Sequence, residues 1–126
     1  MRLLLDTHAL AWWLADSPSL SGRARAAIAE PANEVWASAV SGYELVNKQR
    51  LGKLQSPLAG ELAMMIRRAA LPVMAISLDH AVAAAALPGP HRDPWDRLLM
   101  AQAQLGQLTL VSLDGIFRDY GVGTLW

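Results

Sequence analysis

Residues 3–14 read LLLDTHALAWWL, and this stretch decides the fold class that the sequence predicts. Its first three residues form a short continuous apolar run, which is typical of a strand buried on both faces of a sheet. Apolar residues then recur at a helical spacing from Ala9 to Leu14. A buried strand that leads directly into a helix is the repeating unit of parallel α/β folds.

Strand and helix patterns go on alternating along the rest of the chain. An alanine-rich segment occupies 81–87, and Gly52 and Gly106 are expected to end two of the helices. No repeat, linker or low-complexity tract divides the sequence, so residues 1–126 are expected to form a single domain. We predict an α/β fold, a three-layer α/β/α sandwich around a central, mainly parallel sheet of four to five strands. After the first strand and helix, strands are predicted at 35–37, 73–76, 108–113 and 123–126, and helices at 21–30, 39–50, 57–71, 94–105 and 116–120.

The composition limits the class of protein. The 126 residues are 53% hydrophobic and 17% charged, and so high an apolar fraction predicts a partner or a second copy that covers part of the surface. Eleven Lys and Arg balance eleven Asp and Glu, so any nucleic acid must be held by a local basic patch. The lack of Cys excludes disulfides and thiolate metal sites and fits a cytoplasmic location. Asp6 and His8 interrupt the first apolar run and no 18-residue apolar span follows, which indicates a soluble protein.

Four acidic residues stand out by their positions. Asp6 directly follows the first strand and Asp114 follows the fourth, while Asp96 lies in the first turn of the helix at 94–105. Glu44 lies inside the helix at 39–50. Taken singly, each has a structural explanation, because an Asp after a strand is usually a helix N-cap and a mid-helix Glu usually faces solvent.

Two further Asp residues are assigned to capping alone. Asp79 follows the strand at 73–76, and a role as N-cap explains it completely. Asp93 is expected to cap the next helix, with Pro94 at its first position. Asp96 then falls three residues after the cap, where its carboxylate is expected to reach back in a capping box.

The four acids gain significance from where the fold would place them. Ligands of an open parallel sheet bind beyond the carboxyl ends of its strands, and all four acids are able to approach that end. Clustered carboxylates repel one another unless a hard cation neutralises them, and all-oxygen ligation selects Mg²⁺ or Mn²⁺. Such an ion lowers the pKa of a bound water and stabilises an in-line phosphoryl displacement. The sequence therefore indicates a divalent-metal site suited to phosphoryl displacement.

Several motifs in a fixed order carry a resemblance to a known family. They are LLLDTHAL at 3–10, SAVSGYEL at 38–45, KQRLGKL at 48–54, HRDPWDRLL at 91–99 with AQA at 101–103, LVSLD at 110–114 and the final Trp126. In this order the chain resembles the PIN-domain ribonucleases, and most closely the toxin half of the VapBC toxin–antitoxin modules. The resemblance runs the full length. Its one mild departure is Tyr43, where Trp is expected.

The resemblance implies a fold, an activity and partners. It implies a PIN-like sandwich, hydrolysis of RNA with a metal-activated water, a cognate antitoxin protein that blocks the site, and a homodimer. Asp6 and Asp96 would be the principal Mg²⁺ ligands, with Mn²⁺ as a possible substitute and Thr7 in support. Glu44 and Asp114 would complete the acidic site, directly or through water, and Asp114 is the least secure of the four. Asp93 belongs to the motif, although capping explains it.

Basic and aromatic side chains supply the candidates for contacts with RNA and partners. Near Glu44 a basic stripe, Lys48, Arg50 and Lys53, is a candidate for the RNA backbone, or an ordinary helix end that attracts cations. His91, Arg92 and Arg97 flank the acidic site and are further phosphate candidates, whereas His8 is interpreted as a bystander. Trp12 and Trp13 are candidate exposed residues near a partner interface, with one of them expected in the core.

Two other functions compete with this interpretation. A phosphatase of the haloacid dehalogenase type also begins with a strand that ends in Asp, but it needs a second acid two residues later, where this chain has His8. It also needs a Lys before its last acidic pair, and none lies near Asp114. The other rival is a non-catalytic PIN-like module that acts through protein contacts, and the presence of all four acids argues against it.

Overall fold

The centre of the structure is a parallel sheet of five strands. The computed structural model describes residues 1–54 and 58–126. The strand order is β3-β2-β1-β4-β5, and each of the four pairings is parallel, as the sequence predicted. Leu3 lies in register with Val35 of β2 on one side and with Thr109 of β4 on the other. The strands are β1 (Arg2–Leu5), β2 (Glu34–Ser38), β3 (Val73–Met74), β4 (Thr109–Val111) and β5 (Thr124–Leu125).

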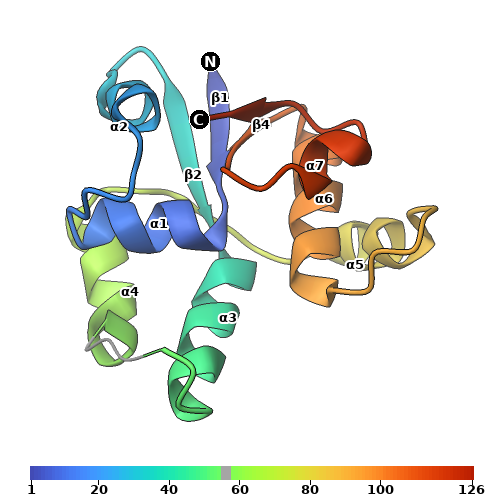
Figure 1. The fold of residues 1–126 in the computed structure, drawn as a ribbon, viewed down its shortest axis with the longest axis horizontal. Helices are drawn as coiled ribbons and strands as arrows, with labels where there is room; N and C mark the ends of the chain where they lie inside the picture. The colour runs from blue at the N-terminus through green and yellow to red at the C-terminus, as the bar shows by residue number, and fades with distance from the viewer. Residues whose placement is uncertain (55–57) are drawn as a thin grey trace.

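Helices cover both faces of this sheet, which confirms the predicted three-layer α/β/α sandwich (Figure 1). One face carries α1, α2 and α4, and the other carries α5, α6 and α7, while α3 extends beyond the end of the sheet (Figure 1). No helix within the described residues is both long and apolar enough to cross a membrane. The helices are α1 (Thr7–Leu14), α2 (Gly22–Ala29), α3 (Ala39–Arg50), α4 (Leu58–Arg68), α5 (Leu78–Ala86), α6 (Pro94–Gly106) and α7 (Ile116–Asp119).

The first strand contributes to two separate cores, one on each face of the sheet. Leu3 and Leu5 pack in the core under α1, α2 and α4, whereas Leu4 packs in the core under α6 and α7. All three side chains are fully buried. A strand alternates its side chains between two faces, and here both faces are covered. This double burial is why the run of three leucines is uninterrupted.

The ends of the helices agree with the sequence in part. The bounds of α3 are those predicted, with the Ser38 hydroxyl accepting the Val40 N–H at 3.0 Å and Gly52 just beyond the helix at φ +72°. The assignment of Asp79 as a cap is wrong. Ser77 caps α5 instead, in a reciprocal capping box with the His80 side chain.

Other boundaries are shorter than expected. Strand β3 ends at Met74, because only Ala37 and Ser38 of β2 pair with it. The helix predicted at 57–71 is described from Leu58 to Arg68, and the proposed start at Pro57 lies outside the described residues. The buried Gln102 side chain links the layers, since its Oε1 accepts the Ser38 hydroxyl at 2.6 Å.

Candidate active site

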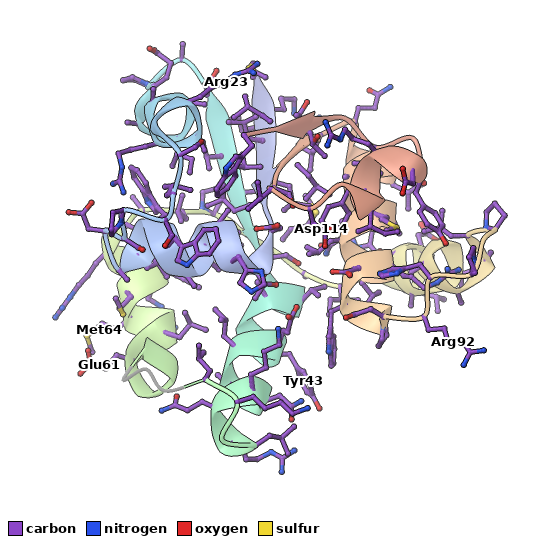
Figure 2. The ribbon with its side chains drawn as sticks, in the orientation of Figure 1. Arg23, Tyr43, Glu61, Met64, Arg92 and Asp114 are labelled. Atoms are coloured by element: carbon purple, nitrogen blue, oxygen red, sulfur yellow. The ribbon has the colours of Figure 1, made fainter. Side chains whose placement is uncertain are left out.

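Two of the predicted acids lie together where β1 and β4 end. The Asp6 side chain caps α1, with Oδ1 accepting the Ala9 N–H at 2.7 Å. The Asp114 N–H donates to the Ser112 hydroxyl, and its Oδ1 accepts the Ile116 N–H, both at 3.0 Å. Figure 2 shows Asp114 in the middle of the molecule, where the chain leaves β4. Both acids line one pocket of about 320 Å³, so the parallel topology brings them together as expected.

Glu44 reaches the same region from α3. Its side chain is buried, and its Oε1 accepts the Thr7 hydroxyl at 2.9 Å. Its Oε2 pairs with the ammonium of Lys48 one turn later, at 2.5 Å. The Ser41 hydroxyl lies 3.0 Å from that of Thr7. The ordinary explanation of a mid-helix Glu, a solvated face, is therefore wrong here.

Asp96 lies in the first turn of α6, and its carboxylate contacts a histidine. Its Oδ2 lies 2.8 Å from Nε2 of His91. Asp93 caps the helix as predicted, accepting the N–H groups of Trp95 and Asp96, and Pro94 holds the first position. The expected capping box is not formed, because the Asp96 carboxylate contacts His91 instead of the backbone at Asp93.

The electrostatics show that these acids are close enough to affect one another. Burial raises the pKa of Asp6 above its ordinary value, and so does the charge of Asp114, while Ser112, Ala9 and His8 lower it. Burial also raises the pKa of Asp96, and the charges of Asp93 and Glu44 add to the rise, while His91 lowers it. Asp6 thus responds to Asp114, and Asp96 responds to Glu44.

The four acids nevertheless do not form one tight group. Across residues 1–54 and 58–126, no three His, Asp or Glu side chains lie close enough together to ligate one ion as they stand. The shared metal site that the sequence suggests therefore stays a prediction. Two couplings are present instead, Asp6 with Asp114 and Asp96 with Glu44. The oxygen donors of all four acids, and the unfavourable burial of Asp6 and Asp96 as anions, fit a hard divalent cation, which would offset both the burial and the mutual repulsion.

The basic candidates divide into two kinds. Arg97 is used inside the chain, where its guanidinium donates to the carbonyls of Ala84, Ala85, Leu87 and His91. These bonds occupy four of the five N–H donors of a guanidinium, so the structure speaks against Arg97 as a contact for RNA. Arg92 points away from the body of the molecule (Figure 2).

One residue of the basic stripe forms an ion pair with the acidic site. The stripe consists of Lys48, Arg50 and Lys53. Lys48 neutralises Glu44, and Arg50 donates to the Asn47 side chain at 2.8 Å. Arg50 and Lys53 are exposed at the end of α3 and in the turn that follows. Their role in holding RNA stays a prediction.

Three supporting residues were missed from the sequence. His91 was considered only for phosphate, Lys48 only for RNA, and Ser112 not at all. The spacing of four between Glu44 and Lys48 on one helix was the available signal for the ion pair. The contact between His91 and Asp96 depends on the fold of the loop before α6, so no local pattern shows it.

Comparison with known proteins gives one consistent result. The PIN domain family matches residues 3–123. Ribonuclease VapC22 of Mycobacterium tuberculosis is 33% identical over 121 residues, which are 94% of this chain and 91% of that protein. The structure of VapBC2 from Rickettsia felis, bound to a promoter DNA fragment, superposes with a TM-score of 0.74 at 17% identity and covers 100% of this chain and 99% of that one. A toxin–antitoxin complex from Klebsiella pneumoniae gives 0.66 at 21% identity, covering 98% and 96%. This chain, whose sequence and fold both match over nearly their whole length, belongs to the PIN-domain family.

Proposed function

We propose that this chain is a metal-dependent endoribonuclease that hydrolyses RNA phosphodiester bonds, the toxin of a toxin–antitoxin pair. The observation that carries the proposal is the convergence of carboxylates at the end of the sheet, with Asp6 and Asp114 in one pocket and Asp96 coupled to Glu44. The relative named Ribonuclease VapC22 supports the same activity. Burial of acids at a cost in stability is typical of functional sites.

The acids differ in how directly they would hold a metal. Asp6 and Asp96 would bind Mg²⁺, or Mn²⁺ in its place, and Glu44 and Asp114 would contribute directly or through water. The bound ion would supply a water of lowered pKa and stabilise the charge that develops on the phosphate. Thr7 orients the Glu44 carboxylate through its hydroxyl, and Lys48 holds the other oxygen in place. Asp6 keeps one oxygen on the Ala9 N–H, which would leave the second for the ion.

Protein partners follow from the same family membership. Solved relatives include toxin–antitoxin complexes, which supports a cognate antitoxin for this chain. A homodimer is the second partner we propose, consistent with the many large apolar side chains that are exposed, among them Ile76, Leu78 and Val82. Light scattering at several protein concentrations tests it, and a monomer throughout contradicts the dimer. We place this activity in the cytoplasm.

Cleavage of RNA by the purified chain is the direct test. Cleavage is expected with Mg²⁺ or Mn²⁺ and is expected to stop in EDTA and in Asp6→Asn. Asp79→Asn is the matched control, because Asp79 is an exposed acid of α5 outside the site, and it should cleave like the wild type. Mapping the RNA ends then identifies the bond that is cut.

The same assay separates the two rivals. A non-catalytic module leaves RNA intact, and its melting temperature does not respond to millimolar metal. A phosphatase turns over small phosphate monoesters and leaves RNA intact. Either result contradicts the proposal.

A further inference from the structure

The pocket that contains Asp6 and Asp114 has a second wall made of aromatic rings. Besides the two acids it is lined by His8 and Trp12 of α1 and by Leu113. The rings of His8 and Trp12 lie 5.5 Å apart between centroids at 33°, and Trp126 lies 5.6 Å behind Trp12 at 59°. Trp126 therefore supports the indole of Trp12 from outside the pocket and limits its movement. The acidic end and the aromatic wall belong to one continuous cavity.

The chemistry of the lining favours a flat, uncharged ring. None of the described residues that line the pocket is Lys or Arg, and a phosphate group placed there would meet two carboxylates, apolar surface and one imidazole, that of His8. The indole of Trp12 offers an aromatic face, and Leu113, which is 62% exposed, offers an apolar edge across from it. Every nucleobase has a π-face that stacks on such a ring.

The size of the pocket limits how many nucleotides of an RNA can enter it. Its volume of about 320 Å³ is at the lower end of the range for small-molecule sites, about 300–1,000 Å³. One nucleoside fits this space and a duplex does not. A base that is paired and stacked inside a helix cannot reach such a wall, whereas a base in a loop or an open strand is free to turn into it.

We propose that this pocket binds the base of one unpaired nucleotide next to the cleaved phosphate, with Trp12 as its stacking surface. The inference rests on the proposed ribonuclease function and adds to it a residue that would position the substrate, Trp12. Trp12 is placed so that a stacked base directs its own phosphate toward Asp6 and Asp114. Recognition is by stacking, so it tolerates different bases.

A second aromatic pair near the acids is the alternative surface on which an RNA base could stack. Tyr43 and Trp95, the residues before Glu44 and Asp96, lie 4.7 Å apart between centroids at 34°. Each of these rings covers one face of the other, although Tyr43 is 58% exposed (Figure 2). Tyr43→Leu therefore removes an aromatic side chain beside the site that is more exposed than Trp12 and does not line the pocket.

Binding of a short single-stranded RNA in EDTA tests the inference without any dependence on metal. The bond cut by the wild type with Mn²⁺ is mapped first, and RNAs are then made that lack one base at each position beside it. Fluorescence anisotropy is expected to show about tenfold weaker binding for one abasic position. Trp12→Leu should weaken binding of the intact RNA to the same extent and should not weaken binding of that abasic RNA further. Tyr43→Leu should bind like the wild type.

Leu113→Trp is a second variant that blocks the pocket, and it keeps the test valid if Trp12→Leu does not fold. Leu113 is exposed at the rim, so a large ring there fills the pocket with little effect on the core, and a similar loss of RNA affinity is expected. The inference is overturned if every abasic RNA binds like the intact RNA, or if Tyr43→Leu causes the loss instead. It is also overturned if the pocket variants weaken only the antitoxin complex. If the wild type cleaves RNA and the pocket variants bind RNA with unchanged affinity, only the base-binding role of the pocket is refuted. If the wild type does not cleave RNA at all, the proposed ribonuclease function is refuted as well.

Discussion

Arg97→Lys separates two possible roles of this residue, hydrogen bonding to backbone carbonyls within the chain and contact with RNA. Lysine keeps the positive charge but has a single ammonium group, which cannot fan out to several carbonyls. Three of the four guanidinium bonds are partly buried, those to Ala84, Leu87 and His91. A hydrogen bond from a charged donor contributes about 1.5–3 kcal/mol, and lysine is able to keep one of the three. With an allowance for water at the partly exposed carbonyls, we expect a loss of about 3 kcal/mol.

The loss is measured by urea unfolding and by thermal melting. For a domain of this size, about 3 kcal/mol corresponds to a fall in Tm of about 12 °C. Arg92→Lys is the matched control, five residues earlier in the same motif. Its side chain points outward (Figure 2), so its free energy of unfolding should change by less than about 0.5 kcal/mol.

Two results would refute this reasoning. If the free energy of unfolding of Arg97→Lys lies within about 1 kcal/mol of the wild-type value, the four bonds to carbonyls do not hold the loop that carries His91. If the same variant also binds RNA more weakly, the contact with RNA predicted from the sequence is correct and the internal role is wrong.

Three further predictions concern the acidic site. Asp6→Asn should raise the melting temperature in EDTA, because it removes a buried charge and keeps the cap on Ala9, and it should abolish most of the rise that Mg²⁺ or Mn²⁺ gives the wild type. The pH dependence has a defined sign: burial raises the pKa of Asp6 above 3.8, so its contribution to stability is complete below that pH and is lost as the pH rises through the raised value. The stability advantage of Asp6→Asn, from urea unfolding in EDTA, should therefore grow between about pH 4 and pH 7, and a constant difference contradicts this. Lys48→Met should cost about 1–2 kcal/mol by leaving Glu44 buried without its cation, and most of that cost should vanish in the double variant with Glu44→Gln.

The fold was predictable because local patterns and long-range packing agree. The run Leu3–Leu5 is fully buried on both faces, and this is what makes it readable as a central parallel strand. The helix Ala39–Arg50 has a clear cap in Ser38 and a clear end near Gly52, so its bounds follow from the sequence. The prediction for Asp79 was wrong because Ser77, two residues earlier, is an equally good cap and lies at the true start of the helix.

The site was predictable in its members and less so in its arrangement. Asp6 and Asp114 were found from the rule that strand ends share one edge of the sheet, which depends only on topology. The contact of Asp96 with His91 depends on side-chain geometry that no local pattern encodes, whereas the spacing of four on one helix does indicate the pair of Glu44 with Lys48. Lys48 and His91 each contact one carboxylate within the chain.

The strand order has a consequence for when the site comes into existence. The first strand lies at the centre of the sheet, and Leu3 is in register with Thr109, so β1 cannot complete its pairing until β4 has been synthesised. Asp114 follows β4 and reaches Asp6 only through that pairing. A chain still emerging from the ribosome therefore carries Asp6 without its neighbour. Such a topology delays assembly of the acidic site until β4 and the residues up to Asp114 have been made.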